Sequence, residues 1–125
     1  MEDFYYRKLK VYHLSKQLVA DIYVTTKTFP PHEAYGLTNQ IQRAVVSIPS
    51  NIAEGMGRFS IKERIHFLDI AYGSTMEVMC QLEVAEILGY ISKQILDAEE
   101  SKIIEISKML MGLRKSLEEK NNKIV

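Results

Sequence analysis

The sequence contains a single cysteine, no net charge and no long hydrophobic run, and each of these absences excludes a class of protein. Cys80 has no partner for an intramolecular disulfide, which favours a reducing compartment, and its helical surroundings predict a buried thiol that acts as a small apolar side chain. Lys+Arg 16 balance Asp+Glu 16, so the chain as a whole is not attracted to nucleic acids or anionic membranes. Binding of that kind would need local clusters of basic residues.

Neither the N-terminal residues nor the hydropathy of the chain predicts a signal peptide or a membrane-spanning helix. The segment MEDFYYRKLK lacks the apolar core of a signal peptide, and no apolar run approaches the length that crosses a bilayer. We therefore expect a cytoplasmic protein. With 125 residues, 46% of them hydrophobic, the chain suffices for one domain around one core, over residues 1–125.

Catalytic and metal-binding patterns are also missing. The sequence has no Ser-His-Asp spacing, no glycine-rich phosphate loop and no evident histidine partner for the cysteine. Glu63 and His66 have the Glu-x-x-His spacing that di-iron bundles use twice, but neither His13 nor His32 follows a glutamate by three residues. We therefore expect a protein that is not an enzyme and that binds no metal or cofactor.

The sequence does contain a segment, from Gln40 to Arg58, that predicts a helix with two different faces. Apolar residues recur there at steps of three and four, and they are Leu37, Ile41, Ala44, Ile48 and Ile52. A polar stripe follows the same steps, through Gln40, Arg43, Ser47, Asn51, Glu54 and Arg58. Because a solvated face would carry mainly Lys and Glu, the amides and the hydroxyl indicate groups placed against partners.

Apolar periodicity and boundary residues together predict four helices. Their ranges are 6–29, 38–56, 61–89 and 93–119. Pro30 and Pro31 end the first helix, and Ser60 followed by Glu63 forms a capping box that starts the third. The second begins near Leu37 or Thr38, the latter a suitable N-cap, and the glycines at 55 and 57 suit a left-handed C-cap.

The second and fourth predicted helices each contain one residue that departs from the pattern. In the second, Pro49 removes the amide that would bond to the Val45 carbonyl, which predicts a kink with Ser47 and Ser50 placed to satisfy freed carbonyls. The alternative is two short helices separated at residue 48. In the fourth, only Glu99 interrupts an a/d heptad seam, and residues 118–125 are polar and expected to fray.

Four helices joined by short turns predict an all-α, up-down-up-down antiparallel four-helix bundle with a Pro-kinked second helix. The first helix carries a second apolar stripe through Tyr12, Val19 and Tyr23, and the third carries one through Phe67, Ala71, Ser74, Val78 and Ala85. A lone bundle does not need this much apolar surface. We therefore expect a homo-oligomer.

Short motifs distributed along most of the chain resemble those of a known protein family. They are Pro30, Glu33, Tyr35-Gly36-Leu37-Thr38, Gln40-Ile41, Arg43-Ala44, Ser47-Ile48, Asn51-Ile52-Ala53-Glu54-Gly55, Phe67-Leu68, Ala71-Tyr72-Gly73-Ser74, Glu77 and Leu88-Gly89-Tyr90. The chain resembles the four-helix-bundle proteins encoded in intervening sequences of bacterial 23S ribosomal RNA genes. That family is similar to the accessory protein of diversity-generating retroelements, which works with a reverse transcriptase.

The resemblance implies a pentameric ring of bundles that binds structured RNA or DNA, or a nucleic-acid-processing protein. The retroelement accessory protein is strongly basic, whereas this chain is neutral. If this chain binds nucleic acid, a ring would help, because each basic cluster repeats around the axis and several phosphates are neutralised at once. The alternative function is a protein–protein interaction scaffold that touches no nucleic acid.

Two basic clusters are the candidates for nucleic-acid binding, and a solvated surface is the alternative interpretation of both. The first comprises Arg7, Lys8 and Lys10, and the second Arg58, Lys62 and Arg64. Tyr5, Tyr6 and Tyr12 lie near the first cluster, where they could stack on bases or pack between subunits.

The polar stripe of the second helix has two interpretations, a ligand-facing site or a buried network that joins the second and third helices. Ser74 and Glu77 on the third helix supply hydrogen-bonding complements, which favours the structural network. The predicted network comprises Gln40, Arg43, Ser47, Asn51, Glu54, Ser74 and Glu77. Arg43 and Glu54 are expected to be paired charges within it.

Overall fold

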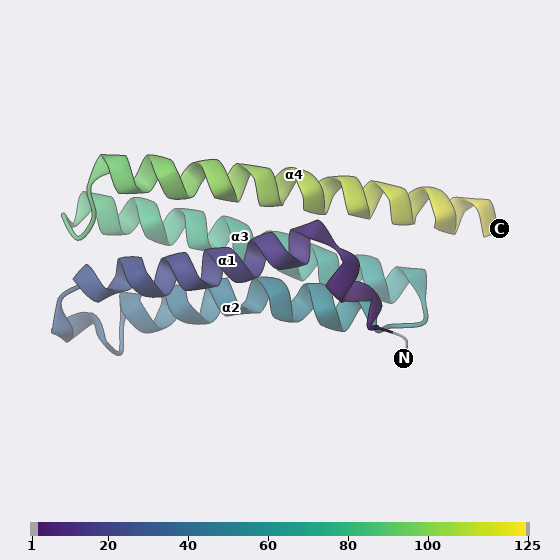
Figure 1. The fold of residues 1–125 in the computed structure, drawn as a ribbon, viewed down its shortest axis with the longest axis horizontal. Helices are drawn as coiled ribbons and strands as arrows, with labels where there is room; N and C mark the ends of the chain where they lie inside the picture. The colour runs from purple at the N-terminus through teal and green to yellow at the C-terminus, as the bar shows by residue number, and fades with distance from the viewer. Residues whose placement is uncertain (1–2, 125) are drawn as a thin grey trace.

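The structure, a computed structural model, describes residues 3–124 and consists of four long α-helices (Figure 1). They are α1 (Lys10–Thr25), α2 (Leu37–Met56), α3 (Ile61–Ile87) and α4 (Lys93–Ile124). Short 3₁₀ turns η1 (Tyr5–Lys8), η2 (Thr26–Thr28) and η3 (Pro31–Glu33) flank α1 and connect it to α2. Successive helices run in opposite directions in Figure 1. The described residues thus form the all-α four-helix bundle that the sequence predicts, and none of their helices is long and apolar enough to cross a membrane.

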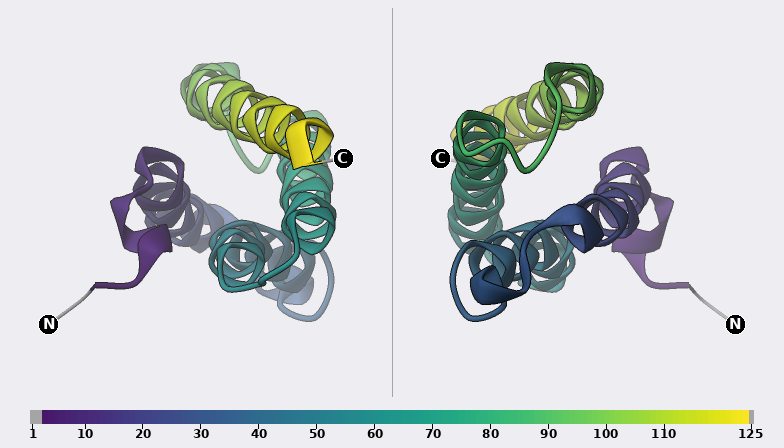
Figure 2. Two further views of the ribbon diagram at one scale, coloured as in Figure 1. Left: turned by 90° about the vertical axis from the view of Figure 1, so that its right-hand side faces the viewer. Right: turned by 90° about the vertical axis from the view of Figure 1, so that its left-hand side faces the viewer.

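The bundle is built around the α2–α3 pair, which has the most extensive packing, and of the four neighbouring helix pairs α1 and α4 contact each other least. The end views in Figure 2 show the four helices following one another around an arc, in the order α1, α2, α3 and α4. The fully buried core draws on all four helices. Its largest members are Leu18, Ile22, Ile41, Ile48, Ile52, Leu68, Leu82, Ile103, Ile106 and Leu110.

α3 uses two apolar stripes inside the bundle, the second stripe named above and a first stripe that consists of Ile65, Leu68, Tyr72, Met79 and Leu82. Leu68 and Tyr72 face α4, where they line a groove with Leu110 and Met111. The other stripe faces α2, since the Ser74 and Ser47 hydroxyls share a hydrogen bond of 2.9 Å. The second stripe of α3 is therefore not surplus surface, contrary to the sequence-based expectation. Apolar residues do remain exposed elsewhere on α3 and α4, including Val84, Ile87, Ile104 and Met111.

The first helix is shorter than the predicted range 6–29. Leu9 has extended backbone angles, φ −87° and ψ 124°, which separate η1 from α1, and the His13 ring donates a hydrogen bond of 2.5 Å to the Arg7 carbonyl across this break. At the other end, the Thr28 hydroxyl donates to the Thr25 carbonyl, and the chain tightens into η2. Periodicity continues through both 3₁₀ turns, which is why it overestimates the helix.

The ends of α2 differ from the predicted caps. Thr38 lies inside the helix, and the amide of Leu37 instead donates to the Glu33 side chain at 3.1 Å. Gly57 has φ −85°, so the predicted left-handed C-cap at this end of α2 is wrong. Among residues 3–124, a positive φ occurs at Gly89, where it is 78° and the chain turns from α3 into α4. The helix is continuous through Pro49, which excludes the alternative of two helices separated at Ile48, and the kink stays a prediction.

The capping box is the boundary that the sequence places best, since the Ser60 hydroxyl accepts a hydrogen bond of 3.2 Å from the Glu63 amide where α3 begins. α4 continues beyond the predicted end at residue 119 and includes residues 118–124, and fraying of this end stays a prediction. Strong helix formers and the Arg114–Glu118 ion pair, one turn apart, extend it. Residue 125 lies outside the described residues.

Cys80 is exposed on α3, whereas the sequence pattern predicts a buried thiol. Its neighbours Val78 and Leu82 are buried and belong to the two apolar stripes. Cys80 lies between these stripes on the outward side of the helix, and apolar composition alone does not locate that side.

Candidate nucleic-acid interface

One end of the bundle brings together segments that are distant in the sequence, and we call it the basic end. It consists of the N-terminal segment with η1, the α2–α3 turn and the C-terminal part of α4 (Figure 1). η1 contacts α2, and Arg114 of α4 donates a hydrogen bond of 2.6 Å to Asp69 near the start of α3. Both basic clusters predicted from the sequence therefore lie at the same end of the molecule.

Charge is distributed unevenly along the bundle although the chain is neutral. The segments at this end, residues 3–10, 54–69 and 105–123, carry the basic residues Arg7, Lys8, Lys10, Arg58, Lys62, Arg64, Lys108, Arg114, Lys115, Lys120 and Lys123. The same segments carry fewer acidic residues: Asp3, Glu54, Glu63, Asp69, Glu105, Glu118 and Glu119. Carboxylates predominate in the other half of the bundle. A neutral chain thus presents a surface of local positive charge.

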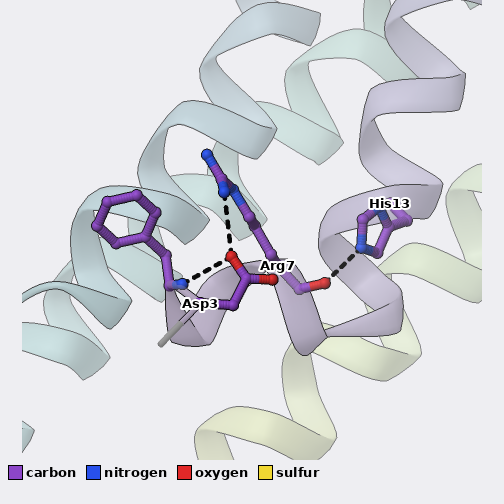
Figure 3. Close-up of polar contacts among 4 residues, drawn as sticks. Asp3, Arg7 and His13 are labelled. Atoms are coloured by element: carbon purple, nitrogen blue, oxygen red, sulfur yellow. Dashed lines mark hydrogen bonds and ion pairs between the residues drawn. The ribbon is translucent and has the colours of Figure 1, made fainter. Parts of the chain in front are cut away.

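The N-terminal cluster is organised by Asp3 (Figure 3). Its carboxylate accepts a hydrogen bond of 2.9 Å from the Phe4 amide and one of 3.0 Å from the Arg7 guanidinium. The hydrogen bond to Asp3, followed by one to Tyr6, raises the pKa of Arg7, whose guanidinium carbon lies 4.8 Å from the Phe4 ring centroid. Arg7 is exposed, so water and salt weaken this pair, and a phosphate could compete with the carboxylate.

The other two residues of this cluster are also exposed. Lys10 lies 3.9 Å from Glu105 of α4, a loose contact between two side chains that are mostly in water. Lys8 forms no ion pair among residues 3–124. Of the three tyrosines singled out in the sequence, Tyr6 and Tyr12 pack edge to face at 4.8 Å and are partly buried, and only Tyr5 is exposed. Tyr6 and Tyr12 therefore pack within their own chain, and Tyr5 is the one of the three that is exposed for stacking on a base or for contact with another subunit.

The second cluster is fixed by the close packing of α2 against α3. A Cβ atom at Gly55 would lie 2.8 Å from the Cβ of Phe67, so only glycine permits this approach. The Arg58 guanidinium rests over the Phe67 ring at 4.8 Å and donates to Glu54 at 2.7 Å. Lys62 is exposed and forms no ion pair among the described residues.

Sequence reasoning missed Phe59, which stands at the tip of the α2–α3 turn with its side chain 100% exposed. A hollow of about 350 Å³ opens beside it, lined also by Ala53, Gly57, Arg58 and the two carboxylates of Glu54 and Glu63. The signal in the sequence was an aromatic residue in a turn between a basic residue and a helix N-cap. The apolar stripes drew attention away from it, because Phe59 belongs to neither neighbouring helix.

The predicted polar network forms only at its centre. The Asn51 amide donates to the Ser47 carbonyl at 2.8 Å and to the Ser47 hydroxyl at 2.9 Å, and that hydroxyl reaches Ser74. The Ser47 hydroxyl therefore joins α2 to α3, whereas the sequence predicts a bond to a carbonyl freed by the proline. These three residues are buried or partly buried, as a structural network requires.

The outer members of the polar stripe lie at the surface. The predicted Arg43–Glu54 pair is wrong, because Glu54 pairs with Arg58 one turn away, as i,i+4 geometry favours. Gln40, Arg43 and Glu77 border an open groove of about 390 Å³ between α2 and α3. Glu77 accepts a hydrogen bond of 3.4 Å from Gln81.

Glu63 and His66 are exposed on α3, and the His66 ring packs against Phe67 at 5.4 Å. Their Glu-x-x-His spacing brings no further ligand with it. Within residues 3–124, no group of three or more His, Cys, Asp and Glu side chains is arranged to hold a metal ion.

Comparison with known proteins supports the fold and identifies the family. A solved structure from Bacteroides thetaiotaomicron VPI-5482, described as a protein of unknown function from the S23 ribosomal protein family, superposes with a TM-score of 0.77. It is 24% identical, and the match covers 84% of this chain and 95% of that one. Comparison with curated proteins gives no match. The family model for 23S rRNA-intervening sequence proteins matches residues 7–112, and this chain belongs to that family.

Proposed function

We propose that this protein is a non-enzymatic, homo-oligomeric bundle that binds structured RNA or DNA through its basic end. The observation that carries the proposal is the meeting of the two basic clusters at one end, beside the exposed rings of Phe59, Phe4 and Tyr5. Cations supply attraction to phosphates, and exposed rings supply surfaces on which bases stack. Because family membership does not by itself convey a function, the argument rests on this surface.

The ion pairs at this end do not prevent phosphate binding. The Arg7–Asp3 and Arg58–Glu54 pairs are exposed, so water and salt weaken them. At Arg7 a phosphate can therefore replace the Asp3 carboxylate at little cost. Lys8 and Lys62 form no ion pair among the described residues, so neither has to break one when it binds a phosphate.

The test is a titration of the protein with a hairpin fragment of 23S ribosomal RNA at rising salt. The proposal predicts that log affinity falls linearly with log salt concentration, because bound phosphates release counterions. The double variant Lys8→Gln/Lys62→Gln should make this slope shallower by about 0.7 to 0.9 for each lysine that contacts a phosphate. The matched control, Lys27→Gln/Lys93→Gln, removes the same charge at the opposite end and should leave the slope unchanged.

A protein–protein interaction scaffold is the second candidate, and the exposed apolar residues of α3 and α4 favour it. It predicts no binding of the hairpin at moderate salt. Equal slopes for both double variants would instead show that binding follows net charge and not the basic end, which would contradict the proposed interface.

A further inference from the structure

The side chain of Phe59 is held out from the bundle by hydrogen bonds on both sides of it in the chain. Before it, the Arg58 amide donates to Gly55 at 3.1 Å, and the Arg58 carbonyl accepts from the Arg64 guanidinium at 2.7 Å. After it, Ser60 caps α3 through the Glu63 amide, and its carbonyl accepts from the Arg64 amide at 3.1 Å. The ring is fully exposed on a fixed backbone, so stacking on it would require little ordering of the turn.

The charged side chains around the Phe59 ring favour a base at one place and a phosphate at another. The hollow beside Phe59 is lined by the Glu54 and Glu63 carboxylates, which repel a phosphate but tolerate an uncharged ring that carries amino groups. Lys62 and Arg64, a few residues along the chain, supply positive charge for the adjoining phosphates. Inside a continuous duplex every base is stacked between its neighbours, so only a terminal base pair could offer a face to this ring.

We propose that Phe59 is a stacking platform for an unpaired nucleobase, so that the ligand of the basic end is a nucleic acid with an unpaired loop or end. This inference rests on the proposed function and narrows it from structured nucleic acids in general to those with accessible bases. Stacking on aromatic rings reads base faces and not sequence, and it is the usual mode of binding for unpaired RNA loops and single strands.

The absence of tryptophan from the sequence makes a direct test possible. In the Phe59→Trp variant, the introduced indole is the only tryptophan of the chain, and its fluorescence reports contact with a base. The probes are an RNA hairpin with an unpaired loop, an RNA duplex with the same number of phosphates whose ends are closed by non-nucleotide linkers, and a DNA hairpin of the same sequence. We expect quenching by the hairpins and none by the duplex; the DNA hairpin shows whether the sugar matters.

Affinity measurements with Phe59→Ala supply the second readout. We expect about 5- to 150-fold weaker binding of the hairpin, the range that loss of one base–aromatic stack produces, with an unchanged salt slope because no phosphate contact is lost. The matched control is Tyr35→Ala, which removes a side chain that is 97% exposed in the α1–α2 connection at the other end of the bundle. This control should bind the hairpin like the wild type, and both variants should melt like the wild type.

The outcomes separate this inference from the proposed function. If the wild type binds the hairpin and duplex alike and Phe59→Ala has no effect, the stacking platform is wrong and the basic end still binds nucleic acid. An unquenched tryptophan at saturating hairpin would also overturn the inference. If the wild type binds neither probe, the proposed function fails and the inference fails with it.

Discussion

The glycines of this bundle show how one residue type serves opposite purposes. At Gly55 a Cβ atom would meet Phe67 at 2.8 Å and the Arg64 carbonyl at 3.3 Å, whereas at Gly73, on the exposed side of α3, it would meet nothing within 4 Å. The first glycine permits two helices to approach closely. At the second glycine, an added methyl group would contact no neighbouring atom.

We therefore predict that the same substitution has opposite signs at these two positions. Gly55→Ala should lower the free energy of unfolding by about 1 to 3 kcal/mol, because the added methyl overpacks the α2–α3 contact. Gly73→Ala should raise it by about 0.5 to 1 kcal/mol, because alanine is the better helix former in an exposed helix interior. Urea unfolding of both variants measures the difference, and destabilisation by Gly73→Ala would contradict the assignment.

Asn51 is the residue on which the α2–α3 polar network depends. Asn51→Ala removes two hydrogen bonds to Ser47 and should cost about 1 to 2 kcal/mol of stability or disassemble the oligomer. Asn39→Ala, on the exposed side of the same helix, is the matched control and should change little. Unchanged melting of Asn51→Ala together with lost nucleic-acid binding would show instead that Asn51 faces a ligand.

Among the elements, the connections at the end opposite the basic end are joined by the Glu33 carboxylate. It accepts a hydrogen bond of 2.7 Å from the Tyr90 hydroxyl, in the α3–α4 turn, and one of 3.1 Å from the Leu37 amide at the start of α2. These two donors, the tyrosine first, lower the pKa of Glu33 below its ordinary 4.5. The Thr28 hydroxyl also donates to the Tyr90 carbonyl, at 3.0 Å.

This lowered pKa predicts the sign of a pH effect on stability. The folded state binds the Glu33 proton more weakly than the unfolded chain, so the contribution of Glu33 is present above about pH 4.5 and is lost as pH falls through the folded pKa. Glu33→Gln keeps an acceptor but cannot titrate. Its melting temperature should therefore fall less between pH 7 and pH 3 than that of the wild type or of the exposed control Glu83→Gln. An equal fall in all three proteins would show that Glu33 does not contribute.

The helices themselves were predictable from the sequence because their signals are local. Ser60 and Glu63 determine the start of α3 through contacts three residues apart, and the apolar periodicity of α2 survives Pro49. The helix ends that were predicted wrongly depend on features outside the helix: the Leu37 amide at the start of α2 is satisfied by Glu33, and α1 begins only after Leu9, whose backbone is extended. The residue pattern within one helix therefore does not predict where α1 or α2 begins.

For the whole molecule, the candidate site could not be predicted from the sequence, although its charged residues could be named. Arg7 and Arg58 are far apart along the chain, and only the bundle places both at the same end. A neutral composition likewise conceals the uneven distribution of charge. Phe59 escaped notice because its exposure depends on how α2 and α3 meet and not on the residues beside it.

Oligomerisation belongs to this scale as well, and it is a prediction that the exposed Val84, Ile87, Ile104 and Met111 support. Light scattering at micromolar concentration should give a multiple of the 14.4 kDa chain mass, with the pentamer as the expected size. The double variant Ile104→Lys/Met111→Lys should lower that mass if this face is buried between subunits. A wild-type protein that is a stable monomer would contradict the predicted ring.

The most direct test of the account is ultraviolet cross-linking of the protein to a ribosomal RNA hairpin, with the attachment sites identified by mass spectrometry. We predict cross-links at Phe59 and within residues 4–8 and 58–64, the segments of the basic end that carry its exposed rings. The opposite end, which carries the equally exposed Tyr35, should give none. Cross-links spread over both ends, or found only near Tyr35, would contradict the claim that the basic end binds nucleic acid.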